Sequence, residues 1–148
     1  MVENWKEKIN SSPKADTYKS HKNLPKFEKY LDTITNSKHL RSFVKLRLFD
    51  HNLMIEKGRR NRPPTPREQR LCPQCKVPGD EIHFLIDCDI CVNRTEFFDR
   101  VINIVPNFPN LPDSKAKFIF LMTQENDTII KLIAKYTYEW FKLIENHP

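Results

Sequence analysis

The chain has 148 residues, of which 25 are Lys or Arg and 19 are Asp or Glu, so its formal net charge at pH 7 is +6. This length suits one domain with a real core, and a composition that is 39% hydrophobic and 11% aromatic excludes wholesale disorder. With 2 glycines, collagen-like repeats and Gly-rich phosphate loops are excluded as well. We expect no membrane partner, because no run of 18 apolar residues occurs. We expect an intracellular location, nuclear or cytoplasmic, because the sequence does not begin like a secretory signal.

Basic residues are concentrated in the first half of the chain. Residues 1–70 carry 17 Lys and Arg against 8 Asp and Glu, whereas residues 71–148 carry 8 against 11. This asymmetry favours a polyanion as the partner of the first half, namely the phosphate backbone of RNA or DNA. The alternative is that these charges only keep the surface solvated.

Hydrophobic periodicity predicts a mainly α fold, with residues 1–148 as a single helical domain. In the first part of the chain we expect a helix around Trp5 that ends at Ser11-Ser12-Pro13, and another helix over Ala15–Lys22. Apolar residues at helical spacing then predict a third helix. These residues are Phe27, Tyr30, Leu31 and Ile34.

A stronger helix is predicted to start at Ser37, as its N-cap, and to run to about Phe49. Its inward residues are predicted to be Leu40, Phe43, Val44 and Leu48. Its other side carries Lys38, Arg41 and Lys45, again at helical spacing. This basic stripe either faces phosphates or is simply a solvated face.

Residues 57–70 form the densest basic stretch, with six cations, one anion and three prolines. Proline lacks a backbone donor and restricts its predecessor, so we expect an extended, exposed loop. Each guanidinium on such a loop offers a bidentate fork to phosphate oxygens, although the same composition suits an inert linker or a nuclear import signal. The candidate phosphate-binding residues here are Lys57, Arg59, Arg60, Arg62, Arg67 and Arg70.

Three further helices are predicted in the C-terminal part, residues 92–148. The first starts at Asp89 or Asn93 and stops near Pro106, and the second, Ser114–Met122, has Asp113 as its N-cap. The last runs from Asp127 to about Asn146 and has an apolar face wide enough for a central core element. Because its aromatic residues follow the helical period, we assign them to the core rather than to base stacking.

All four cysteines lie within twenty residues of one another. In a reducing compartment, clustered cysteines indicate metal binding or redox chemistry, and no βαβ pattern surrounds this cluster to support a redox motif. One histidine completes the pattern C-x2-C-x7-H-x4-C, a ligand set that zinc favours in closed structural sites. The predicted zinc ligands are Cys72, Cys75, His83 and Cys88.

A rival ligand set replaces His83 with Cys91, giving C-x2-C-x12-C-x2-C, and spacing alone leaves this set open. His83 is favoured because it stands at a helix start that Asp80 can cap, after Pro78-Gly79 has reversed the chain. Cys91 falls on an apolar helical face, where it is explained as a buried thiol. With four protein ligands, the zinc would hold structure rather than activate water.

Two stretches around the cysteines also carry a resemblance to a known family. They read Arg67-Glu68-Gln69-Arg70-Leu71-Cys72-Pro73-Gln74-Cys75 and Asp80-Glu81-Ile82-His83-Phe84-Leu85-Ile86-Asp87-Cys88. They resemble the C-terminal zinc-binding region of non-LTR (LINE-type) retrotransposon reverse transcriptases. Less specific stretches that are similar to the same family are Ser12-Pro13-Lys14 with Thr17-Tyr18-Lys19, Lys45-Leu46-Arg47, the segment from His51 to Arg59, and Lys135-Tyr136 with Phe141-Lys142.

The resemblance implies that the histidine and three cysteines of the pattern are zinc ligands. It also implies binding to template RNA and target DNA, beside the catalytic part of a reverse transcriptase. The chain departs from the family at Asp89, where a proline usually follows the last cysteine. It contains no Tyr-x-Asp-Asp polymerase signature and no endonuclease segment, so we expect no enzymatic activity from a fragment or stand-alone remnant of this kind.

These observations together predict a small helical domain built around a CCHC zinc knuckle, acting as a non-catalytic, zinc-dependent module that binds RNA or DNA. The alternative is a zinc-stapled protein-interaction domain that does not bind nucleic acid. The expected order is N-terminal helices in 1–56, a basic Pro-rich loop in 57–70, the knuckle in 71–91 and C-terminal helices in 92–148.

Overall fold

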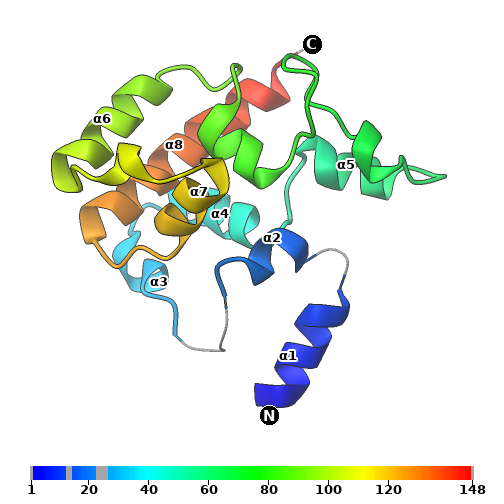
Figure 1. The fold of residues 1–148 in the computed structure, drawn as a ribbon, viewed down its shortest axis with the longest axis horizontal. Helices are drawn as coiled ribbons and strands as arrows, with labels where there is room; N and C mark the ends of the chain where they lie inside the picture. The colour runs from blue at the N-terminus through cyan, green and yellow to red at the C-terminus, as the bar shows by residue number, and fades with distance from the viewer. Residues whose placement is uncertain (1, 13–14, 23–26, 148) are drawn as a thin grey trace.

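The computed structural model describes residues 2–12, 15–22 and 27–147, and in these residues the regular elements are all helical, which confirms the mainly α prediction. Extended pairing within them is limited to one isolated antiparallel bridge, between Leu71 and Pro78. No helix in the described part of the chain is both long enough and apolar enough to cross a membrane. The elements in Figure 1 are α1 (Val2–Ser11), α2 (Asp16–Lys19), α3 (Tyr30–Thr33), α4 (Ser37–Arg47), α5 (Met54–Arg60), η2 (Arg67–Gln69), η3 (His83–Asp87), α6 (Arg94–Ile104), η4 (Phe108–Asn110), α7 (Ser114–Met122) and α8 (Asp127–Glu145).

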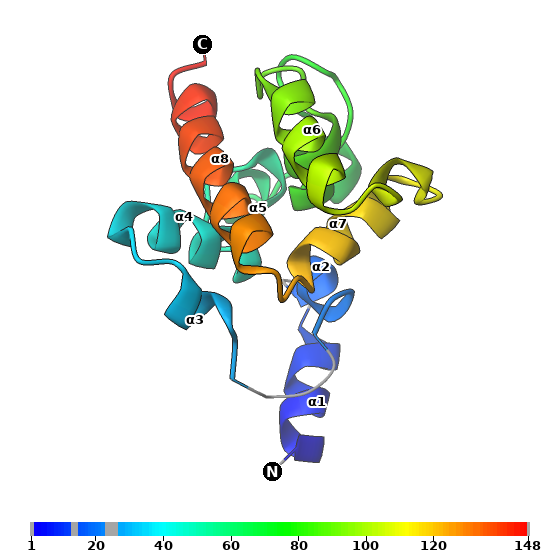
Figure 2. The ribbon, with the colours of Figure 1, turned by 90° about the vertical axis from the view of Figure 1, so that its left-hand side faces the viewer.

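Helix α8 is the central element of the core, as its wide apolar face predicted. Helix α4 packs along it, and α3, α6 and α7 pack against it as well (Figures 1 and 2). Trp140 is 1% exposed and donates a hydrogen bond from its indole Nε1 to the carbonyl of Val92 at 2.8 Å. The other buried residues of α8 are Ile129, Ile130, Ile133, Ala134, Tyr136 and Thr137.

The N-terminal part differs from its prediction in the extent of its helices. Helix α1 ends at Ser11 as expected and projects from the body of the molecule (Figures 1 and 2). The helix expected through the next apolar residues is a single turn, α3, so Phe27 and Leu31 are 67% and 46% exposed. One helical turn cannot keep four apolar residues on one face, and only Tyr30 and Ile34 of this set are buried.

Helix α4 starts at Ser37 itself, so its N-cap is Asn36, one residue before the predicted cap. The side chain of Asn36, rather than Ser37, accepts hydrogen bonds from the backbone N–H groups of residues 38 and 39. The helix ends at Arg47, so Leu48 is 42% exposed and not inward as predicted. Arg47 is buried instead, and its Nη1 donates to the carbonyl of Met122 at 2.6 Å, which joins α4 to α7.

The stretch 57–70 is only partly the extended loop that its prolines predicted. Residues 57–60 belong to α5, because prolines at positions 63, 64 and 66 restrict the backbone only from Arg62 onward. The chain then folds back, since the N–H of Thr65 donates to the carbonyl of Gly58 at 2.9 Å. A Cβ on Gly58 would lie 2.5 Å from Cγ of Arg70, so glycine makes room for this arginine.

The C-terminal helices lie where the sequence predicted them. Asp113 caps α7 by accepting a hydrogen bond from the N–H of Ala116 at 2.7 Å. Asn93, at φ 63°, precedes α6, which settles the starting point that the sequence left open between this residue and Asp89. The boundaries of α8 differ from the prediction by one residue at its end.

Candidate metal centre

A tight backbone turn presents the first two cysteines. The N–H of Cys72 donates to the carbonyl of Val77 at 2.8 Å, and the N–H of Lys76 donates back to the carbonyl of Cys72 at 3.0 Å. Lys76 takes up a left-handed conformation at φ 60° to close this turn. The chain therefore reverses between residues 73 and 76, and the prediction that Pro78-Gly79 makes the reversal is wrong.

Gly79 has a different role, because it lies against two other segments. A Cβ at this position would come within 3.0 Å of Cβ of Met54 and 3.2 Å of the backbone nitrogen of Cys72. The carbonyl of Gly79 also accepts a hydrogen bond from the N–H of Ile55 at 3.1 Å. These close approaches fasten the turn to the start of α5.

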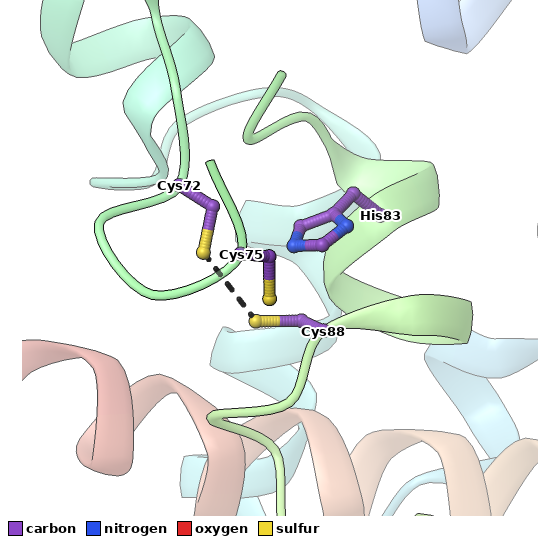
Figure 3. Close-up of side chains that lie close together, drawn as sticks. All are labelled: Cys72, Cys75, His83 and Cys88. Carbon is purple, nitrogen blue, oxygen red and sulfur yellow. Dashed lines mark hydrogen bonds between the residues drawn. The ribbon is translucent and has the colours of Figure 1, made fainter. Parts of the chain in front are cut away.

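The second pair of candidate ligands, His83 and Cys88, is presented by the π-helical turn η3. Asp80 caps the start of this turn as predicted, since its Oδ1 accepts a hydrogen bond from the N–H of His83 at 2.8 Å. At the other end, the N–H of Cys88 donates to the carbonyl of His83 at 2.8 Å. This wide turn brings the two side chains to the same side of the backbone (Figure 3).

The four predicted ligands converge on one point (Figure 3). One ligand atom from each of Cys72, Cys75, His83 and Cys88 lies within 4.8 Å of the others. A tetrahedral ion with metal–sulfur bonds of about 2.3 Å separates its sulfur ligands by about 3.8 Å, and the sulfurs of Cys72 and Cys88 are 3.8 Å apart. The imidazole Nε2 of His83 is buried without a hydrogen-bond partner, which a coordinated cation would supply.

Cys91 lies outside this group of four, as the favoured assignment required. It is 2% exposed and unbridged, and its thiol lies beside Cys88. A hydrogen bond with Cys91, followed by burial, raises the pKa of Cys88 to about 11. Burial likewise raises the pKa of Cys75 to about 11. A metal ion reverses these shifts, because its charge stabilises the thiolates that coordinate it.

The backbone around the cluster is held by a residue that sequence reasoning missed. Arg94 donates hydrogen bonds to the carbonyls of Cys88, Phe84 and Leu85, and its guanidinium lies 5.0 Å from the ring centroid of Trp140. Because the partners of Arg94 are backbone carbonyls, no spacing of residues in the sequence predicts this role. The N–H of Asp89 points to the sulfur of Cys75 at 3.4 Å, a contact that favours a coordinating thiolate.

Buried hydrogen bonds connect Glu81, which lies two residues before the candidate ligand His83, to the N-terminal part of the chain. Nε2 of His51 lies 2.9 Å from Oε1 of Glu81, and Oε2 of the same carboxylate accepts from the hydroxyl of Thr17 at 2.9 Å. The N–H of Leu53 donates to Nδ1 of His51, so Nε2 carries the proton that faces Glu81. Hydrogen bonds from His51 and Thr17 outweigh burial and lower the pKa of Glu81.

The basic stripe predicted on α4 is exposed in full: Lys38, Arg41 and Lys45 all point away from the core. Beside it, the ammonium of Lys142 lies 4.3 Å from the ring centroid of Tyr138, whose pKa it lowers by hydrogen bonding and charge. These two α8 residues were not among the predicted site residues. The helical period could have found them, because both lie outside its apolar face.

The six candidates in 57–70 divide into two groups. Arg59 pairs with the buried carboxylate of Glu56 at 2.7 Å, and Arg70, half-buried, donates to the carbonyls of Thr65 and Ile55. The outward candidates are Lys57, Arg60, Arg62 and Arg67, of which Arg60 also donates to the carbonyl of His51 and Arg67 lies 3.4 Å from Asp16.

Lys45 of α4 and Arg60 of α5 line one cleft of about 210 Å³. The same cleft carries two carboxylates, those of Asp50 and Glu145. The fold therefore joins the α4 stripe to the outward cations of α5, although the sequence separates them.

Comparison of the chain with known protein families, curated proteins and solved structures found no match in any of the three.

Proposed function

We propose that the chain is a non-catalytic nucleic-acid-binding module held together by one zinc ion. The observation that carries the proposal is the set of outward cations on α4 and α5, which are linked where Lys45 and Arg60 line one cleft and which include Lys57 beside the candidate metal centre. The cations of this basic track are Lys38, Arg41, Lys45, Lys57 and Arg60.

Zinc is proposed because the donor atoms are three sulfurs and one imidazole nitrogen that lie within 4.8 Å of one another, and because the 3.8 Å between the sulfurs of Cys72 and Cys88 fits a shared tetrahedral ion. Four protein ligands leave no open position for a reacting water, so the ion would act on structure. Each ligand pair comes from a different turn, the 73–76 reversal and η3. A shared ion would cross-link these turns and keep the segment that follows α5 in place.

The basic track suits a polyanion because its charges are exposed and closely spaced. On α4, Lys38, Arg41 and Lys45 follow the helical period, so their side chains leave the helix on one face. Asp50 and Glu145 reduce the positive potential where the track crosses the cleft. Binding through such contacts would be largely independent of sequence and would weaken steeply as salt rises.

A place beside the catalytic part of a reverse transcriptase remains part of the proposal. It rests on the likeness of the knuckle to retrotransposon reverse transcriptases. The nucleic-acid-binding activity does not depend on it, because the basic track argues for a phosphate partner on charge and exposure alone.

The test is a mobility-shift titration with RNA and DNA at two salt concentrations. Replacing Lys38, Arg41 and Lys45 together by alanine should weaken binding roughly tenfold to a hundredfold and reduce the salt slope by about three. A matched control removes three exposed cations elsewhere, Lys6 and Lys8 of α1 and Lys115 of α7.

The control variant has the same net charge as the α4 variant, so it should bind far better if the track is the interface. Equal losses in the two variants would show a mere net-charge effect and contradict the proposed interface. If the zinc-loaded protein binds neither RNA nor DNA, the proposed function is wrong and the protein-interaction alternative is favoured.

A further inference from the structure

A pocket among the described residues lies directly against the candidate metal centre. It has a volume of about 460 Å³, and one side of it is formed by Cys72, His83 and Cys88. Sites for small organic groups in proteins typically measure about 300–1,000 Å³. The pocket is therefore large enough for a group much bigger than a metal ion or a water molecule.

The lining of this pocket combines apolar side chains with a few polar groups. The apolar residues include Met54, Pro73 and Ile144. The polar groups include the amide of Asn52 and the carboxylates of Asp80 and Glu145. Apolar walls suit the face of an aromatic ring, and the oxygens of these side chains can accept hydrogen bonds from amino groups on its edge.

Cations of the basic track line the pocket and the cleft next to it. Lys57 lines the pocket itself, and Arg60, one turn later on α5, lines the neighbouring cleft together with Lys45. The pocket and the cleft also share Asn52, Ile144 and Glu145. A phosphate backbone that follows these cations would carry its bases past an opening lined by apolar side chains.

We propose that this pocket receives one unpaired base of a single-stranded nucleic acid, while Lys57 and Arg60 hold the flanking phosphates. The inference rests on the proposed function and adds the kind of nucleic acid that is preferred. In a duplex each base is stacked and paired, so it cannot enter a pocket unless it first leaves the helix. The carboxylates favour bases that carry an amino group, which thymine and uracil lack.

The test compares a single-stranded 12-mer of adenine and cytosine with its duplex, by fluorescence anisotropy. Replacing Ile144 by tryptophan would fill the pocket, and the matched control is Ile104→Trp, on the exposed side of α6. The pocket variant should bind the single strand about tenfold more weakly, which is the typical effect of losing one stacked base. Because Ile144 also lines the cleft with Lys45 and Arg60, the duplex affinity of this variant should fall much less than its single-strand affinity, and the control should keep both affinities.

A second measurement uses the unaltered protein and so does not depend on how the variant folds. A base in the pocket covers the sulfurs of Cys72 and Cys88, so the single strand should slow the removal of zinc by a chromophoric chelator several-fold. The duplex should slow it much less, and a 12-mer of thymine should protect less than the mixed strand.

The two proposals fail in different ways. If neither the single strand nor the duplex binds, the nucleic-acid function itself is wrong. If both bind, but Ile144→Trp does not discriminate between them or the chelator removes zinc at the same rate with either, only the base pocket is wrong.

Discussion

Two basic segments of this chain look alike in sequence and are used differently by the fold. On α4, Lys38, Arg41 and Lys45 point outward, and the core face of the same helix is anchored to α8. In 57–70, by contrast, Arg59 and Arg70 turn inward, to a buried carboxylate and to backbone carbonyls. A cation-rich stretch therefore contains both structural cations and candidate interface cations, and the exposure of each guanidinium in the fold distinguishes the two groups.

The largest effect should come from removing a candidate metal ligand, which should loosen the segment 57–70 while leaving α4 in place. The segment 57–70 is fastened to the metal cluster, whereas α4 is fastened to α8, so Cys75→Ser should loosen only the first. Structural zinc contributes about 10–16 kcal/mol in small zinc-finger peptides, which have no other core, whereas the buried residues of α8 give this domain a core of its own. Hydrogen exchange should show lost protection at the N–H groups of Cys72 and Gly79, with protection kept at Ile130 of α8.

The matched control for this change is Cys91→Ser, because Cys91 is a neighbouring thiol that is more deeply buried than Cys75 but lies outside the ligand group. It should keep its metal and its exchange pattern. Metal retained in Cys75→Ser, or lost equally in both variants, would mean that the ligand group is assigned wrongly.

A smaller effect is expected from removing one inward guanidinium. Arg70→Met keeps the aliphatic stem that packs on Gly58 but removes the donors to Thr65 and Ile55, which should lower the free energy of unfolding by about 2 kcal/mol. Denaturant unfolding measures the change. The exposed Arg62→Met should stay within about 0.5 kcal/mol of the unaltered protein; similar losses in both would erase the distinction between inward and outward arginines.

Arg47, the buried cation of α4, contributes to the pH dependence of stability through its effect on His21. Burial and, next, the charge of Arg47 lower the pKa of His21 to about 3 from its usual 6.5. Between these pH values the unfolded chain binds a proton that the folded chain does not, so His21 makes stability fall as pH drops, by about 1.4 kcal/mol per pH unit.

Urea unfolding at several pH values between 6.5 and 4 should show this slope, and His21→Phe should reduce it. Phenylalanine is the suitable replacement because His21 packs edge-on against the rings of Tyr18 and Phe118. An unchanged pH dependence in His21→Phe would show that His21 titrates normally in the folded protein.

The smallest effect should come from Asp50, which faces the cleft between Lys45 and Arg60. Asp50→Asn removes one repulsive charge from the basic track and should strengthen nucleic-acid binding about twofold at low salt, with the gain fading at high salt. The control is Asp99→Asn on α6, which is exposed and does not line this cleft. Equal gains in both would trace the effect to net charge.

The features that the sequence predicted best are those written in local patterns. The apolar period of α8, the cap at Asp113 and the convergence of the four candidate metal ligands each depend on residues close together in the chain. The sequence could not show that the chain turns at 73–76 rather than at Pro78-Gly79, because the two turns use similar residue types. Nor could it show the inward arginines, since the carbonyls that accept their hydrogen bonds carry no sequence signature.

Three residues that were predicted to be buried are exposed because their helices are shorter than predicted. Phe27, Leu31 and Leu48 were expected on core faces, yet α3 is a single turn and α4 ends at Arg47. Periodicity says which residues share a face while a helix lasts, but tertiary packing decides where it stops. The position of the basic track beside the metal cluster is likewise a product of packing, because it joins residues of α4 and α5.

A native mass spectrum of the intact protein, purified without added metal, is the most direct measurement of the central claim. The account predicts a single dominant species that carries one zinc ion per chain. A chain that carries no metal, or that shows the mass of a disulfide between the clustered cysteines, would contradict it.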